Sequence, residues 1–248
     1  MNKIFFLHIP KTGGSSVNDV FANEFRNDCY LEHIENLEPR EIDKVLHKDD
    51  FFISGHVPYP RIKNLLEKII DIKRIVILRD PFDHLISHIS WIYNLYSDIA
   101  RFEQHPVEVQ DLSAFLNGID FNSLDDLQHF VETLSPYGIA SFDNRQTRYL
   151  SDPSDAKWVT EKDYLKGLNN IKDFDFVGFF ENLPSDVQKL AQCILQKSIK
   201  VPHINKKNKK VFSITHQQDE IKELLFPLLK YDLSLYKTYN KMNGVFLQ

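Results

Sequence analysis

The chain has 248 residues, 42% of them hydrophobic, which is enough to bury the core of one domain spanning 1–248. Its formal net charge of -5 provides no overall positive field for a nucleic-acid backbone, so any anion site must be local. No run approaches the roughly 20 apolar residues of a membrane span, and the apolar start is too short for a signal peptide. Cys29 and Cys193 match no metal or redox spacing, which predicts reduced, buried thiols in a cytoplasmic protein.

Short apolar runs alternate with helical patterns in the first part of the chain. The predicted strands are residues 4–9, which form a short continuous apolar run, and the mainly apolar runs 51–54 and 75–78. Helical spacing follows each strand, over 17–25, over 62–69, and from Pro81 to about Tyr96 with Asp80 as the N-cap. Alternating strands and helices predict an α/β fold, in which helices cover both faces of a mostly parallel sheet.

The second part of the chain is mainly helical. Residues 97–173 are polar with helical patterns, and we interpret them as a helical insertion with capping signals at Ser123 and Thr160. The remaining predicted elements are a strand over 174–179, a helix from Pro184, a lysine-rich loop over 203–211, and a helix over 218–242 that is broken near Pro227.

A glycine loop follows the first predicted strand. In the stretch HIPKTGGSS, Gly13 and Gly14 permit positive φ angles, and Lys11 supplies a cation. The hydroxyl-bearing residues of the loop are Thr12, Ser15 and Ser16. Together with the N-terminus of the following helix, these groups predict a phosphate site, although an ordinary strand-to-helix turn is the alternative. The loop differs from a Walker A sequence because Lys11 precedes the glycines, which weakens a kinase interpretation.

The stretch PKTGGSS resembles the 5'-phosphosulfate-binding loop of sulfotransferases that use 3'-phosphoadenosine-5'-phosphosulfate (PAPS). It is most similar to the carbohydrate branch, which includes the heparan sulfate 2-O-sulfotransferases. The resemblance implies a P-loop-type three-layer αβα fold, PAPS as donor and adenosine 3',5'-bisphosphate as product. It also implies that Lys11 stabilises the leaving phosphate and that residues Thr12 to Ser16 cradle the donor.

A second anion site is predicted after the strand at 75–78. Arg79 lies at its carboxyl end, where open α/β sheets bind ligands. Ser87 shares a helix face with Asp80, so Arg79 and Ser87 can converge on one ligand. This spacing resembles the 3'-phosphate motif of the same family. The alternative is an Arg79 paired with Asp80 or Asp83 and a solvated Ser87.

The lysine-rich loop lies where family members carry a basic loop over the 3'-phosphate. This chain departs from several relatives because the loop contains lysines and no arginine, and lysine cannot hold a phosphate with two parallel hydrogen bonds. The expected 3'-phosphate contacts in the loop are Lys206, Lys207 and Lys210. For any one of these lysines, a solvated side chain is an equal alternative.

A histidine is the best candidate for the base that removes the acceptor's proton. His56 follows a predicted strand and a glycine, and the stretch SGHVPY resembles the segment that carries the catalytic base in the carbohydrate branch. The alternative is a histidine that only satisfies a backbone carbonyl. His84 and His88 are four residues apart, but no third ligand completes a metal site, so we expect flanking or surface positions for both. Glu181 is a reserve base or acceptor-binding residue.

These patterns predict sulfuryl transfer to a hydroxyl, favoured to be on a carbohydrate, without a metal. Asn144, Gln146 and Arg148 are candidate acceptor contacts, with an exposed polar helix as the alternative. A small-molecule or glycan acceptor is the expected partner, and nucleic acid is not. The rival interpretations are a P-loop kinase, which requires ATP and magnesium, and a protein that binds PAPS or adenosine bisphosphate without catalysis.

Overall fold

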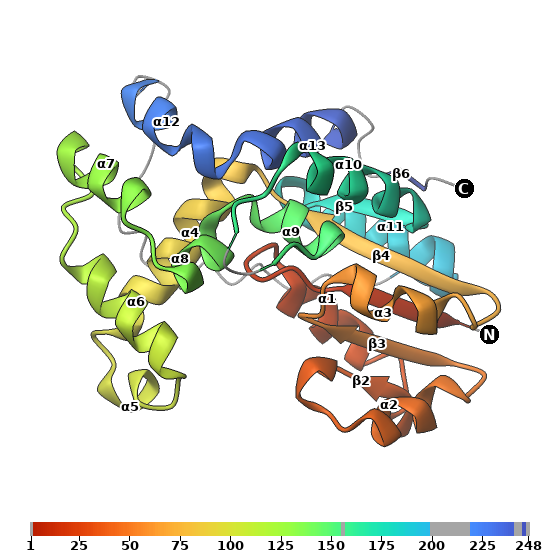
Figure 1. The fold of residues 1–248 in the computed structure, drawn as a ribbon. Coiled ribbons are helices and arrows are strands. Elements are labelled where there is room, and N and C mark those ends of the chain that lie inside the picture. The colour runs from red at the N-terminus through yellow and green to blue at the C-terminus, as the bar shows by residue number, and fades with distance from the viewer. Residues whose placement is uncertain (1, 155–156, 199–218, 241–244, 247–248) are drawn as a thin grey trace.

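A computed structural model describes residues 2–154, 157–198, 219–240 and 245–246 (Figure 1). At its centre is a six-stranded sheet in which only the last pair, β5 with β6, is antiparallel. In spatial order the strands are β2 (Tyr30–Leu31), β3 (Phe51–Gly55), β1 (Lys3–Leu7), β4 (Ile72–Leu78), β5 (Phe176–Phe179) and β6 (Val245–Phe246). The predicted mostly parallel sheet is therefore confirmed, with strand limits shifted by up to three residues.

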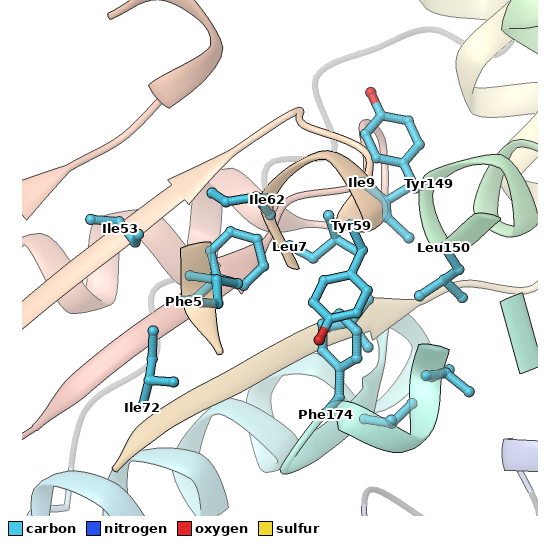
Figure 2. Close-up of a cluster of buried hydrophobic side chains, with 14 of the residues drawn as sticks. Phe5, Leu7, Ile9, Ile53, Tyr59, Ile62, Ile72, Tyr149, Leu150 and Phe174 are labelled. Carbon is cyan, nitrogen blue, oxygen red and sulfur yellow. The ribbon is translucent and has the colours of Figure 1, made fainter. Parts of the chain in front are cut away.

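One face of the sheet is covered by helices from distant parts of the chain. They are α3 (Tyr59–Leu66), α9 (Arg145–Ser151), α10 (Glu161–Asn170) and α13 (Lys230–Asn240). Figure 2 shows Phe5 and Leu7 of β1 in the same apolar cluster as Tyr59 of α3 and Leu150 of α9. All four side chains are buried, and burying each stabilises the fold by about 2 kcal/mol.

The opposite face of the sheet packs on α1 (Gly14–Ala22) and α11 (Leu183–Leu195). Because successive side chains of a strand point to opposite faces, Ile4 and Phe6 lie on this side of β1. They pack with Phe21 of α1 and Leu190 of α11. Helices therefore cover both faces, which confirms the predicted three-layer αβα arrangement.

A further apolar core lies beside the sheet and is built mainly from helices. Its members are α4 (Pro81–Leu95), α6 (Val107–Asn117), α7 (Leu124–Glu132), α8 (Pro136–Phe142), α12 (Asp219–Leu225) and the 3₁₀ segment Phe226–Leu228. Figure 1 shows α5 (Ile99–Phe102) to α8, in yellow-green and green, extending to one side of the sheet. Residues 97–154 and 157–173 are helical or in turns as predicted, although α9 and α10 return to cover the sheet. Ser123 and Thr160 cap their helices as predicted.

Some details differ from the sequence-based predictions. The first helix ends at Ala22, so Phe25 lies beyond it, and α2 (Pro39–Leu46) was not predicted. The C-terminal helical region is interrupted at Pro227 as predicted. Both cysteines are free, but Cys193 is exposed rather than buried because it lies on the outer face of α11. Among the described helices, none has the length and apolar character needed to cross a membrane.

Candidate active site

The candidate site lies at the edge of the sheet where the parallel strands β1, β3, β4 and β5 end. The strands that follow β1 in the chain, β2 and β3, lie on one side of it, whereas β4 lies on its other side. The strand order therefore reverses at β1. β1 and β4 are direct neighbours, with Leu7 opposite Val76. In open α/β sheets, the crevice at such a reversal of strand order is the place where ligands bind.

The loop after β1 is tightly shaped. Lys11 and Gly13 both have left-handed backbone conformations, with φ angles of 69° and 88°. A Cβ on Gly14 would lie 2.0 Å from the His8 ring, and one on Gly13 would lie 2.7 Å from Leu183. The loop therefore requires glycine at both positions, because a side chain would displace the packing around it.

The N-terminus of α1 offers free backbone donors to this loop. No side chain caps this helix, and its first turn contains no acidic residue. Ser15 is exposed in the first turn, whereas Ser16 is nearly buried. The buried hydroxyl of Thr12 donates to the Ile9 carbonyl at 2.8 Å and so holds the loop. The free N–H groups and the helix dipole favour an anion at this point.

Arg79 meets the glycine loop directly. Its Nη1 donates to the carbonyl of Lys11 at 2.9 Å, and its guanidinium lies 4.1 Å from the centre of the Phe180 ring. Nε of Arg79 is buried and has no hydrogen-bond partner among the described residues. The two predicted anion-binding clusters therefore converge, although they are 68 residues apart in sequence.

Two cations lie close together at this point. Burial lowers the pKa of Lys11, and the positive charges of Arg79 and Arg101 lower this pKa further. No ion pair joins Lys11 to a carboxylate within the described part of the chain. The sequence analysis did not predict that Arg101 lies near Lys11, because no motif around Arg101 on α5 indicates this contact. An arrangement of adjacent cations fits an anionic ligand, which would remove their mutual repulsion.

The other predicted donor contacts are only partly described. Ser87 is partly exposed on α4, two helical turns beyond the N-cap Asp80, whose side chain accepts from the backbone of Asp83. Lys206, Lys207 and Lys210 lie outside the described residues. Their contacts with a 3'-phosphate stay predictions.

His56 follows β3 and adjoins the β1 loop. Its Nδ1 donates to the His8 carbonyl at 2.6 Å, which leaves Nε2 with the lone pair. Its backbone N–H donates to Glu35 at 2.8 Å. Burial lowers the pKa of His56, partly opposed by the hydrogen bond to His8 and the charge of Glu35. The carbonyl contact foreseen as the alternative is present, and it orients the ring as a base requires.

A cleft of about 180 Å³ opens beside His56. Besides His56, its lining includes Arg61, Arg145, Arg148 and Tyr149. The guanidinium of Arg145 lies 5.1 Å from the centre of the Tyr149 ring. Several hydrogen-bond donors therefore face a small space next to the candidate base.

His84 and His88 are buried, which corrects the surface part of the prediction of flanking or surface positions. They are 2% and 5% exposed, because α4 lies between the sheet edge and the helical core. Nε2 of His84 donates to the Pro10 carbonyl at 2.7 Å and so fixes the glycine loop to α4. Burial lowers the pKa of His84 to about 3 and that of His88 well below its usual value. Neither belongs to a cluster of potential metal ligands in the described residues.

Asn144, Gln146 and Arg148 are buried, so the alternative of an exposed polar helix is wrong. Their polar groups have internal partners. The side chain of Gln146 donates to the carbonyl of Arg79 and accepts from its backbone N–H, both at 2.9 Å. Asn144 accepts from the backbone of α13, and Arg148 forms an ion pair with Asp143 at 2.8 Å. These contacts hold the scaffold together, and only Arg148 also lines the cleft.

Glu181 connects two parts of the site. One of its oxygens accepts from the backbone of Asp80 at 2.8 Å, and the other accepts from the hydroxyl of Tyr236 at 2.9 Å. The carboxylate thereby links the start of α4 to α13. Both oxygens are used in these contacts, which favours a structural role over that of a base.

The sheet with helices on both faces, the glycine loop and the strand-end arginine define an α/β protein of the P-loop type. A protein-family model with the description Sulfotransferase family matches residues 1–240. The chain therefore belongs to the sulfotransferase family. The protein is accordingly a transferase of sulfuryl groups. No curated protein matches the chain.

Proposed function

We propose that this sulfotransferase moves a sulfuryl group from PAPS to a hydroxyl of a carbohydrate acceptor. The observation that carries the proposal is the 2.9 Å hydrogen bond from Arg79 to the carbonyl of Lys11. It brings two cationic elements together at the edge of the sheet, as a nucleotide with phosphate groups on both the 3' and the 5' side of its ribose requires. PAPS is also the usual donor of the family.

The donor's 5'-phosphosulfate would lie on the loop from Lys11 to Ser16. The uncapped N-terminus of α1 supplies backbone donors there, and Lys11 supplies a positive charge. Arg79 and Ser87 would hold the 3'-phosphate, with the lysines at 206, 207 and 210 as further contacts. The unpartnered buried Nε of Arg79 supports this assignment, because an anion would compensate a guanidinium that has few partners.

The chemical step is an in-line displacement at sulfur. The acceptor oxygen forms a bond to sulfur while the bond from sulfur to the phosphate oxygen breaks, and Nε2 of His56 takes the hydroxyl proton. Lys11 neutralises the charge that develops on the departing adenosine 3',5'-bisphosphate. Positioning and electrostatic stabilisation supply the catalysis, and the step uses no metal.

The acceptor would bind in the cleft beside His56. Arg145 lines the cleft, Arg61 forms an ion pair with Asp152 there at 2.7 Å, and Tyr149 adds an aromatic ring. Such a mixture suits a sugar, which presents several hydroxyls together with apolar ring faces. The resemblance of PKTGGSS and SGHVPY to the heparan sulfate 2-O-sulfotransferase branch supports the same choice.

Calorimetric titration with adenosine 3',5'-bisphosphate and with ATP plus magnesium tests the donor. Preference for the bisphosphate supports the proposal, whereas preference for ATP would indicate a kinase. Incubation with ³⁵S-labelled PAPS and a panel of glycans, steroids and phenols then tests transfer. Labelled glycan is the expected result. Binding of the bisphosphate without transfer to any acceptor would favour a non-catalytic binding protein.

A further inference from the structure

A cluster of potential metal ligands lies next to the cleft, between β2 and the end of β3. It consists of His33, Glu35 and His56, and one ligand atom from each lies within 4.8 Å of the other two. Nδ1 of His33 is 3.1 Å from Glu35, and the rings of His33 and His56 are 5.2 Å apart between centres. No other group of this kind occurs in the part of the chain that the structure describes.

The backbone around the cluster is built to bring these side chains together. His33 has a left-handed conformation with φ of 53°, which is uncommon for a residue other than glycine and indicates a constrained position. A Cβ on Gly55 would lie 2.6 Å from the carboxylate of Glu35 and 2.6 Å from Ile34. The segment that carries His33 and Glu35 therefore packs directly on the glycine before His56.

The contacts around His56 prepare it as a ligand. Metal-binding histidines usually donate their second ring N–H to a carbonyl or carboxylate, which orients the ring and leaves the other nitrogen free. His56 does this through Nδ1 and the His8 carbonyl, at 2.6 Å.

We propose that His33, Glu35 and His56 form a site for a transition-metal ion such as Zn²⁺. Two imidazoles and one carboxylate form a ligand set that zinc accepts, with a fourth position open to water. A tetrahedral site with bonds of about 2.1 Å places its ligand atoms about 3.4 Å apart. The ligand atoms of the cluster lie within 4.8 Å of one another, and the side chain of His33 is 47% exposed, so it has room to turn toward a bound ion.

Occupation of this site would inhibit sulfuryl transfer. The metal would use the lone pair on Nε2 of His56, the same lone pair that is needed to accept the proton of the acceptor. This consequence depends on the proposed role of His56 as base, whereas metal binding itself does not. We therefore expect zinc to inhibit the transfer reversibly, because zinc and the acceptor's proton would compete for Nε2 of His56.

Calorimetric titration of the chelator-treated full chain with Zn²⁺ tests the site without donor or acceptor. We expect the chain to bind one equivalent of zinc tightly. In His33→Ala and in Glu35→Gln the dissociation constant for zinc should be at least about tenfold higher. His47→Ala is the matched control, because His47 is an exposed histidine 3.5 Å from the carboxylate of Asp43 and reports adventitious surface binding. The proposal is overturned if the chain binds no zinc at micromolar concentration, or if His33→Ala binds it as tightly as the unmodified chain.

The inhibition is measured separately, as the rate of sulfuryl transfer with zinc relative to the rate without it. We expect loss of turnover that a chelator restores, and a tenfold higher zinc requirement in His33→Ala. Unchanged turnover in a chain that holds stoichiometric zinc would refute the inhibition. If the chain transfers no sulfuryl group at all, the proposed function fails, but the zinc titration still decides the metal site.

Discussion

The loop after β1 and helix α9 are both rich in polar residues, but they use these residues differently. In the loop, the N-terminus of α1 has no side-chain cap, and Lys11 has no ion pair within the described residues. In α9, Gln146 and its neighbours are buried and bonded to Arg79, α13 and each other. Both regions were predicted to bind ligand, so polar composition alone does not distinguish a binding surface from an internal hydrogen-bond network.

This contrast predicts two opposite mutational outcomes. Changes in the loop and at His56 should remove activity and preserve stability, because the proposed function places their polar groups against a ligand. Changes in the α9 network should lower stability first, because they leave buried donors without partners.

The largest expected effect is on turnover. Lys11→Met retains most of the chain length but removes the charge, and His56→Asn retains a donor for the His8 carbonyl but removes the base. Each should lower kcat by about 100-fold or more. The free energy of unfolding should change by less than about 1 kcal/mol. Single-turnover transfer measures the rate, and urea unfolding measures the stability. A loss of activity accompanied by a large loss of unfolding free energy would contradict the contrast.

The next largest effect is expected at Asp232 of α13. Its carboxylate accepts from the backbone of Gln146 at 3.0 Å and from the backbone and hydroxyl of Thr147, both at 2.7 Å. Asp232→Ala should lower the free energy of unfolding by about 3 kcal/mol, because three buried donors lose their acceptor. Urea unfolding measures the loss. Asp219→Ala, at the exposed start of α12, is the control and should change little.

A smaller effect concerns the acid stability of the chain. His84 has a pKa of about 3 in the folded protein and about 6.5 when unfolded, so the unfolded state binds the additional proton between these values. The stability from His84 is therefore complete above pH 6.5 and lost as the pH falls toward 3. His84→Gln keeps a donor for the Pro10 carbonyl but does not titrate. In this variant the unfolding free energy should fall less steeply as the pH is lowered, because unfolding takes up about one proton fewer. An unchanged slope would be evidence against this.

The smallest effect is expected on the pH dependence of turnover. Burial lowers the pKa of His56, so the acid limb of kcat/KM should lie below pH 6.5. Because the charge of Glu35 raises this pKa, Glu35→Gln should move the limb to lower pH, by less than about one unit. Glu67→Gln, on an exposed residue, serves as the control. A shift to higher pH in Glu35→Gln would show that the limb belongs to another group.

Local signals in the sequence predicted most of the fold. Mainly apolar runs marked β1, β3, β4 and β5, because strands buried on both faces have no polar side. The two-residue strand β2 is too short to form a pattern. Helix α2 does carry a signal that could have been read, since Pro39 occupies its first turn and Glu38 and Glu41 form a capping box.

The candidate site was predictable only where its chemistry is local. The loop from Lys11 to Ser16 and the strand-end Arg79 are recognisable from neighbouring residues. The contact of Gln146 with Arg79 spans 67 residues and the contact of Glu35 with His56 spans 21, so neither leaves a local pattern. The burial of His84 was not predicted, because the absence of a metal site was the only reason given for its position, whereas α4 is enclosed on most sides.

The closeness of Lys11 and Arg79 has a consequence for the proposed donor site when it is empty. Two like charges held near one another at a partly buried position repel each other, and this repulsion contributes to the lowered pKa of Lys11. A bound dianion would remove the repulsion, and only the folded chain holds the two cations together. Binding of the proposed nucleotide should therefore raise the melting temperature of the protein.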